Sequence, residues 1–130
     1  MSAENPTIII IDDDSFLLDM YALKFKQSGF EVSTALGSED AWDKIQKGAT
    51  PDVMLVDLVM PSMTGFELLK KIEEKNLIPK TVKVVLSNRN QQNDIEEAKK
   101  YNIAGYIVKA NNTPSEVITK IKDILKEHSK

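Results

Sequence analysis

Two short apolar runs that end in aspartate constrain the fold of this chain most strongly. Four isoleucines at 8–11 lead directly into three aspartates at 12–14, and the apolar run at 53–56 leads directly into Asp57. Each run has the length of a buried strand, and the strands of a parallel α/β sheet end at one common edge. We therefore expect carboxylates that are far apart in the sequence to share one crevice.

The acids at these strand ends predict a metal site. Carboxylates in one crevice repel each other by about 4 kcal/mol per pair, at about 4 Å and an effective dielectric near 20, unless a cation joins them. A lone aspartate after a strand is usually a turn residue or a helix cap, and Asp14 can cap the helix that follows. A helix start needs one such cap and not three. The sequence therefore predicts a divalent-metal site at this edge.

Apolar runs alternate with amphipathic segments along the whole chain, as in repeated βα units. We expect strands at 7–11, 30–34, 52–57, 81–87 and 105–108. We expect helices at 15–28, 38–47, 64–75, 91–101 and 114–127. This order of elements predicts an α/β fold with one parallel sheet. A sheet whose strand order reverses next to the first strand would bring the ends of the first and third strands together.

Local signals support several of these elements. Gly29 and Gly48 suit the left-handed position after the first and second helices. Thr64 and Glu67 form a capping-box pattern, and residues 113–116 repeat it with proline at the first helical position. The aromatic side chains are expected to pack in the core, namely Phe16, Tyr21, Phe25, Trp42 and Phe66.

Composition excludes several classes of function. The 130 residues suit one domain, 1–130, and the last expected helix ends so near the C-terminus that we expect no output domain. Lys and Arg total 17 against 20 Asp and Glu without a basic stripe, which argues against direct binding of nucleic acid or anionic membranes. Cysteine is absent and His128 is the only histidine, so any metal needs oxygen ligands. Without a leader or a long apolar run, the chain is expected to be soluble and cytoplasmic.

Ser87 and Lys109 follow the two remaining strands and should line the same crevice. Each alone would be an ordinary turn or surface residue. Together with the acids they supply carboxylates for a metal, a hydroxyl donor, and a cation for a dianionic group. This combination is typical of a phosphoryl-transfer pocket.

Four blocks of sequence resemble the receiver domain of two-component response regulators. They are residues 10–14 (IIDDD), 55–65 (LVDLVMPSMTG), 85–87 (VLS) and 105–109 (GYIVK). The resemblance covers roughly the whole chain. It implies a doubly wound, flavodoxin-like five-stranded sheet of order 2-1-3-4-5 with five helices. It also implies a signalling domain rather than an enzyme, with no chemistry beyond its own phosphorylation and dephosphorylation.

The resemblance implies a role for each residue of the crevice. Asp57 is expected to accept the phosphoryl group from a sensor histidine kinase or a phosphotransfer protein, and to be a ligand of Mg²⁺. Asp13 is expected to bind Mg²⁺ directly, Asp12 mainly through metal-bound water, and Val59 through its backbone carbonyl. Lys109 is expected to neutralise phosphoryl oxygens.

Ser87 and Tyr106 are the expected switch residues by the same resemblance. Ser87 would move to hydrogen-bond the phosphoryl group, and Tyr106 would turn inward into the vacated space. This would change the surface of the fourth helix, fifth strand and fifth helix, where an unidentified downstream protein is expected to bind. The kinase is expected to bind near the first helix, around 16–26. We expect a monomer, with dimerisation of the phosphorylated form left open.

Three positions depart from the commonest receiver pattern or vary within it. Ala110 follows Lys109 where receivers usually have proline. Because a cis bond before a non-proline residue costs about 3 kcal/mol, we expect the 109–110 peptide to be trans. Val59 offers no side-chain group to orient water, and Arg89 could reach over the mouth of the pocket. We therefore expect the phosphorylated form to decay slowly, over many minutes or longer.

Two other functions are weighed against this one. Asp12 and Asp14 satisfy the Asp-x-Asp pattern of haloacid-dehalogenase-like phosphatases, which is the enzyme alternative. Against it, no paired acidic motif follows Lys109, and Asp57 would have no role. An FMN-binding domain is disfavoured, because its first loop should offer hydroxyls and amides to a phosphate, whereas this loop offers three acids.

Overall fold

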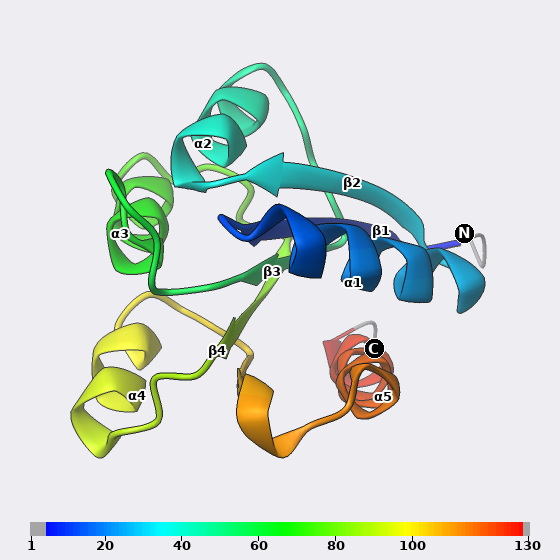
Figure 1. Ribbon diagram of the computed structural model, residues 1–130. Coiled ribbons are helices and arrows are strands. Elements are labelled where there is room, and N and C mark those ends of the chain that lie inside the picture. The colour runs from blue at the N-terminus through cyan, green and yellow to red at the C-terminus, as the bar shows by residue number, and fades with distance from the viewer. Residues whose placement is uncertain (1–4, 129–130) are drawn as a thin grey trace.

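The computed structural model describes residues 5–128, which form one parallel sheet with helices on both faces (Figure 1). The strand order is β2-β1-β3-β4-β5, which confirms the order that the resemblance implied. The strands are β1 (Thr7–Asp12), β2 (Glu31–Leu36), β3 (Val53–Val56), β4 (Val82–Ser87) and β5 (Gly105–Val108). The helices are α1 (Ser15–Gln27), α2 (Ser38–Gln46), α3 (Gly65–Glu74), α4 (Gln92–Lys99) and α5 (Pro114–His128). All ten predicted elements are present, with bounds within one or two residues.

Alternating side chains of the strands form two hydrophobic cores, one on each face of the sheet. Ile9 and Ile11 pack with α2, α3 and α4. Ile8 and Ile10 pack with α1 and α5 on the opposite face. Figure 1 shows this division, with α1 and α5 on one side of the strands and the other three helices on the other. Strand β3 is buried along its whole length, as expected of a central parallel strand.

The predicted caps are confirmed. Gly29 and Gly48 have φ of 96° and 109°, in the left-handed region that favours glycine at a helix end. The Glu67 N–H donates to Thr64 Oγ1 at 3.1 Å, and the Thr64 N–H donates to the Glu67 carboxylate at 2.8 Å. Residues 113–116 form the same reciprocal pair at the start of α5. These helix starts are therefore fixed locally.

The aromatic predictions hold except for one. Tyr21 and Phe25 are buried between α1 and the sheet, and Trp42 and Phe66 pack against the core of the other face. Phe16 is 79% exposed, so its predicted packing is wrong. It lies two residues before the first buried position of α1, which places it roughly 200° around the helix from the buried stripe.

The longest helix, α5, packs on the sheet along one stripe. Its 15 residues bury Val117, Ile118 and Ile121, and most other positions face solvent. None of the helices within residues 5–128 combines the length and the apolar character needed to cross a bilayer.

Candidate functional site

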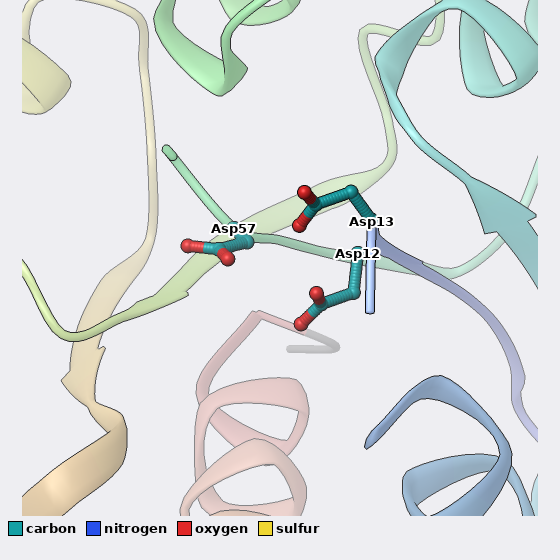
Figure 2. Close-up of side chains that lie close together, drawn as sticks. All are labelled: Asp12, Asp13 and Asp57. Carbon is teal, nitrogen blue, oxygen red and sulfur yellow. The ribbon is translucent and has the colours of Figure 1, made fainter. Parts of the chain in front are cut away.

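The carboxyl ends of the strands surround a cleft of about 480 Å³ that contains the predicted acids. Figure 2 shows Asp12, Asp13 and Asp57 gathered at the ends of β1 and β3. One carboxylate oxygen from each lies within 4.8 Å of the others. The cleft is completed by Asp14, Leu17, Val59, Ser87, Asn88, Arg89 and Lys109. The structure thus brings the predicted site residues together, except Tyr106, which does not line the cleft.

The register of the sheet places Asp57 beside Asp12. Ile11 of β1 is paired with Val56 of β3, and the Asp57 N–H donates to the Ile11 carbonyl at 3.1 Å. The loop after β3 then turns back so tightly that a Cβ on Gly65 would lie 2.2 Å from the Asp57 carbonyl oxygen. Only glycine permits this close approach, and the start of α3 therefore holds Asp57 in place.

Lys109 bridges two of the acids. Its Nζ lies 2.8 Å from Asp12 Oδ2 and 3.2 Å from Asp57 Oδ2, and all three side chains are nearly buried. Burial by itself would lower the pKa of Lys109, but the hydrogen bond to Asp12 and the charges of Asp57 and Asp12 outweigh it and raise the pKa. Burial and the charges of Asp12 and Asp57 raise the pKa of Asp13. The ammonium therefore remains charged between two carboxylates.

Negative charge still exceeds positive charge in this cluster. Three carboxylates face one ammonium, and their oxygens converge from two neighbouring strand ends. Oxygen ligands of this kind suit a hard divalent cation such as Mg²⁺. The donor set of the cleft therefore fits the predicted metal.

Asp14 has a different role from its two neighbours. Its carboxylate accepts hydrogen bonds from the N–H groups of Phe16 and Leu17 at 3.0 and 3.2 Å, which confirms it as the cap of α1. The Asp14 N–H in turn donates to Asp12 Oδ1 at 3.0 Å. The cap gives Asp14 a structural role, so its place in the Asp-x-Asp pattern needs no phosphatase to explain it.

Both expected switch residues, Ser87 at the end of β4 and Tyr106 in β5, contact the loop after β4. Ser87 is fully buried, and its Oγ accepts from the Arg89 N–H at 3.3 Å. The Tyr106 hydroxyl donates to the Arg89 carbonyl. The Arg89 guanidinium donates to Asp94 at 3.0 and 2.8 Å, so it is tied to α4 rather than laid across the mouth of the pocket. The sequence analysis missed Asp94, although opposite charges five residues apart across a helix start were a visible signal.

The exit of β5 follows the prediction. No cis peptide bond occurs among residues 5–128, so the peptide between Lys109 and Ala110 is trans. Residues 109–111 form a 3₁₀ turn, and the Ala110 N–H donates to Asn88 Oδ1 at 2.8 Å. Asn88, another residue that the sequence analysis missed, thus holds the turn that carries Lys109. Proline at 110 could not make this bond.

Val59 also lines the cleft. Its N–H donates to Asp57 Oδ1 at 3.3 Å, and its side chain is largely exposed. The contact fixes the Asp57 carboxylate beside the backbone of residue 59. The role of the Val59 carbonyl as a metal ligand stays a prediction.

Comparisons with known proteins agree with this architecture. A family model described as the response regulator receiver domain matches residues 8–122. The chain is 24% identical to the phosphate regulon transcriptional regulatory protein PhoB of Rhizobium meliloti, over 93% of this chain and 52% of that protein. It is 27% identical to the response regulator GtcR of Aneurinibacillus migulanus, over 68% of this chain and 35% of that protein. The chain thus spans about half or less of these relatives.

Solved structures show the same fold. The chemotaxis protein CheY4 of Vibrio cholerae superimposes with a TM-score of 0.84 at 27% identity, over 92% of this chain and 98% of that one. A CheY-like receiver domain protein of Methanospirillum hungatei superimposes with a TM-score of 0.87 at 26% identity, over 97% and 98%. The chain therefore belongs to the response regulator receiver domain family.

Proposed function

We propose that this receiver domain accepts a phosphoryl group on the Asp57 carboxylate, in a Mg²⁺-dependent reaction with a sensor histidine kinase or a phosphotransfer protein. The observation that supports this most is the convergence of Asp12, Asp13 and Asp57 around the ammonium of Lys109. The acceptor role goes to Asp57 by the resemblance to receivers, and its contacts with Lys109 and with the Val59 N–H suit that role.

The transfer exchanges one bond to phosphorus for another. An oxygen of Asp57 attacks the phosphorus, and the bond from phosphorus to the donor, a histidine nitrogen or an acetate oxygen, breaks with its electron pair. The product is an acyl phosphate. A carboxylate is a weak nucleophile, so the acceleration comes from positioning and from neutralising charge.

Asp13, Asp57 and the Val59 carbonyl would hold Mg²⁺ directly, and Asp12 would act through metal-bound water. When bound, the ion supplies positive charge next to the phosphoryl oxygens. Lys109 supplies a second positive charge, and the trans 109–110 peptide and the Asn88 contact hold the turn that carries it. The Ser87 hydroxyl supplies a hydrogen bond to the phosphoryl group after a small movement of its loop.

The proposed partners bind two different surfaces. Phe16 and Leu23 on α1 are 79% and 56% exposed, which gives the kinase an apolar surface beside the cleft. The downstream protein binds α4, β5 and α5, where Tyr106 contacts the loop after β4. We propose that the chain meets its kinase in the cytoplasm.

Acetyl phosphate with Mg²⁺ tests this function. Intact mass measurement should show the addition of one phosphoryl group, which hydroxylamine removes as expected for an acyl phosphate. The same incubation with a chelator in place of Mg²⁺ should add none. Phosphate uptake that is independent of metal, or that resists hydroxylamine, would contradict the proposal.

A second assay separates this signalling domain from a phosphatase. The protein should not turn over p-nitrophenyl phosphate. Rapid multiple turnover that Asp12→Asn abolishes and Asp57→Asn preserves would favour the phosphatase alternative instead.

A further inference from the structure

Arg89 connects three elements through three different groups. Its N–H donates to Ser87 Oγ at 3.3 Å, at the end of β4. Its carbonyl accepts from the hydroxyl of Tyr106 in β5. Its guanidinium donates from Nε and from one terminal nitrogen to Oδ1 of Asp94 at 3.0 and 2.8 Å. One residue thus contacts the expected hydroxyl donor, the expected switch aromatic and the fourth helix.

The guanidinium of Arg89 binds a carboxylate that is nearly buried. Asp94 lies in the first turn of α4 and is only 7% exposed, whereas the Arg89 side chain is 51% exposed. A buried carboxylate is costly unless it is paired and hydrogen-bonded. The start of a helix also favours negative charge. Arg89 therefore has a fixed anchor on α4.

This ion pair differs from the other surface pairs of the molecule. In the pair between Lys47 and Asp43, both side chains are more than half exposed, at 75% and 58%. Exposed pairs of that kind contribute little, because water and salt screen them. The bond between Arg89 and Asp94 joins a loop to a helix through two hydrogen bonds on a nearly buried acid. It can transmit a displacement, which an exposed pair within one helix cannot.

We propose that Arg89 is a positioning residue that couples the Ser87 hydroxyl to the first turn of α4. Movement of Ser87 toward a phosphorylated Asp57 displaces residue 89, and the bond to Asp94 carries that displacement into the helix. The Tyr106 hydroxyl changes its contact in the same movement, because its acceptor is the Arg89 carbonyl. The inference rests on the proposed function, since phosphorylation is what moves Ser87.

Two substitutions act on the ion pair from opposite ends, one by removing the guanidinium and the other by weakening its acceptor. Arg89→Met removes the guanidinium but retains the apolar stem, the N–H to Ser87 and the carbonyl for Tyr106. Asp94→Asn removes the charge of the acceptor at nearly constant shape. Lys100→Met is the matched control, since it removes another ion pair of the same region, to Glu97 at 3.3 Å, without touching the loop.

The measurement is a titration with beryllofluoride and Mg²⁺, a mimic of the phosphoryl group, followed by amide NMR. The parent and the control should show shifts at Ser87 and throughout the first turn of α4. In Arg89→Met and Asp94→Asn, the Ser87 shift should persist while the shifts of residues 92–95 fall at least threefold. Arg89→Lys keeps a charge with a less suitable geometry, and it should restore part of the α4 response.

Two outcomes would overturn the inference. Residues 92–95 of Arg89→Met could respond as in the parent, in which case the bond carries no displacement. The amide resonances of residues 92–95 in Arg89→Met could instead lie, before any beryllofluoride is added, where those of the parent lie after its addition. The bond would then hold α4 in its inactive position and would not transmit a displacement. The proposed function fails separately, if the parent itself shows no response at Asp57 and Ser87, and the inference then falls with it. Arg89 lies in a loop and outside the core, so Arg89→Met decides the matter even if Asp94→Asn does not fold.

Discussion

One lysine lies nearly buried at the carboxyl ends of the strands and another is fully buried near their amino ends, and the two have opposite pKa shifts. At the carboxyl edge, the pKa of Lys109 is raised, since the hydrogen bond to Asp12 and the charges of Asp57 and Asp12 outweigh the effect of burial. At the amino edge, burial lowers the pKa of Lys83, and Glu73 offsets only part of the effect. Lys83 is 1% exposed, and its Nζ lies 3.7 Å from Glu73 and near two backbone carbonyls.

The contrast shows how a structural lysine differs from a functional one. The Nζ of Lys83 donates to the carbonyls of Ile78 and Thr81, so this lysine holds the segment before β4 in place. Its ammonium is therefore not offered to a ligand. Lys109 lies among acids that outnumber it, so its surroundings attract a cation, and with that cation bound they can accept a dianion. The cavities differ in the same sense, because the one that Lys83 lines is about 170 Å³ and the acid cleft about 480 Å³.

The largest effect is expected from removing an acid of the cleft. Asp13→Ala should lower Mg²⁺ affinity at least tenfold, about 1.4 kcal/mol, and should lose phosphorylation with it, because fewer charged ligands hold the ion more weakly. Calorimetric titration with Mg²⁺ measures the affinity. Asp14→Ala is the control, since it removes the cap of α1, costs about 1 kcal/mol of stability and should leave Mg²⁺ affinity intact. An Mg²⁺ affinity of Asp13→Ala equal to that of the parent would contradict Asp13 as a metal ligand.

The next effect concerns Lys109. Lys109→Met should lower the free energy of unfolding by about 3 kcal/mol without Mg²⁺, because it leaves two nearly buried carboxylates unpaired. Mg²⁺ should restore most of that loss, while the response to phosphorylation stays poor. Urea unfolding with and without Mg²⁺ measures this. A loss that Mg²⁺ does not recover would show that the ammonium and the metal do not compensate the same charges.

Lys83→Met should change the free energy of unfolding much less, within about 1 kcal/mol, because replacing a poorly paired buried charge with an apolar side chain is often neutral or stabilising.

The pH dependence of the free energy of unfolding tests Lys83 further. Since the folded pKa lies below the ordinary value of 10.5, the unfolded chain binds more protons between the two values, and stability should rise with pH there. The parent should show this rise in urea unfolding toward pH 10.5, and Lys83→Met should lack it. A rise of equal size in both proteins would remove Lys83 as its cause.

The smallest effect is expected at the rim of the acid cleft. Val59→Asn should shorten the lifetime of the phosphorylated form several-fold, equivalent to about 1 kcal/mol of barrier, by offering a group that orients water. Decay of the intact-mass adduct after removal of acetyl phosphate measures the lifetime. A half-life of Val59→Asn equal to that of the parent would contradict the predicted part of Val59 in slow decay.

The sequence predicted what depends on local periodicity and on strand ends. Runs such as 8–11 and 53–56 read directly as strands, and their parallel arrangement forces Asp12 and Asp57 to the same edge. The strand order came from the resemblance to receivers, since local patterns do not fix how strands are arranged. Asp14 as a helix cap followed from the position of the next helix.

The rest depended on contacts between distant segments. Nothing local shows that Lys83 is buried, because the segment around Ile78 and Thr81 must fold over it first. The need for glycine at 65 is visible only when α3 approaches the Asp57 carbonyl. Phe16 was misjudged as a core residue because its side of α1 depends on which stripe of the helix meets the sheet.

The most direct test of the account is the phosphorylation of Asp57→Asn by acetyl phosphate and Mg²⁺, compared with that of the parent. The substitution keeps the size of the side chain and removes the nucleophilic carboxylate. The parent should take up one hydroxylamine-labile phosphoryl group that peptide mapping places on Asp57, and Asp57→Asn should take up none. A hydroxylamine-labile phosphate on Asp57→Asn to the parental extent would contradict Asp57 as the acceptor and the function built on it.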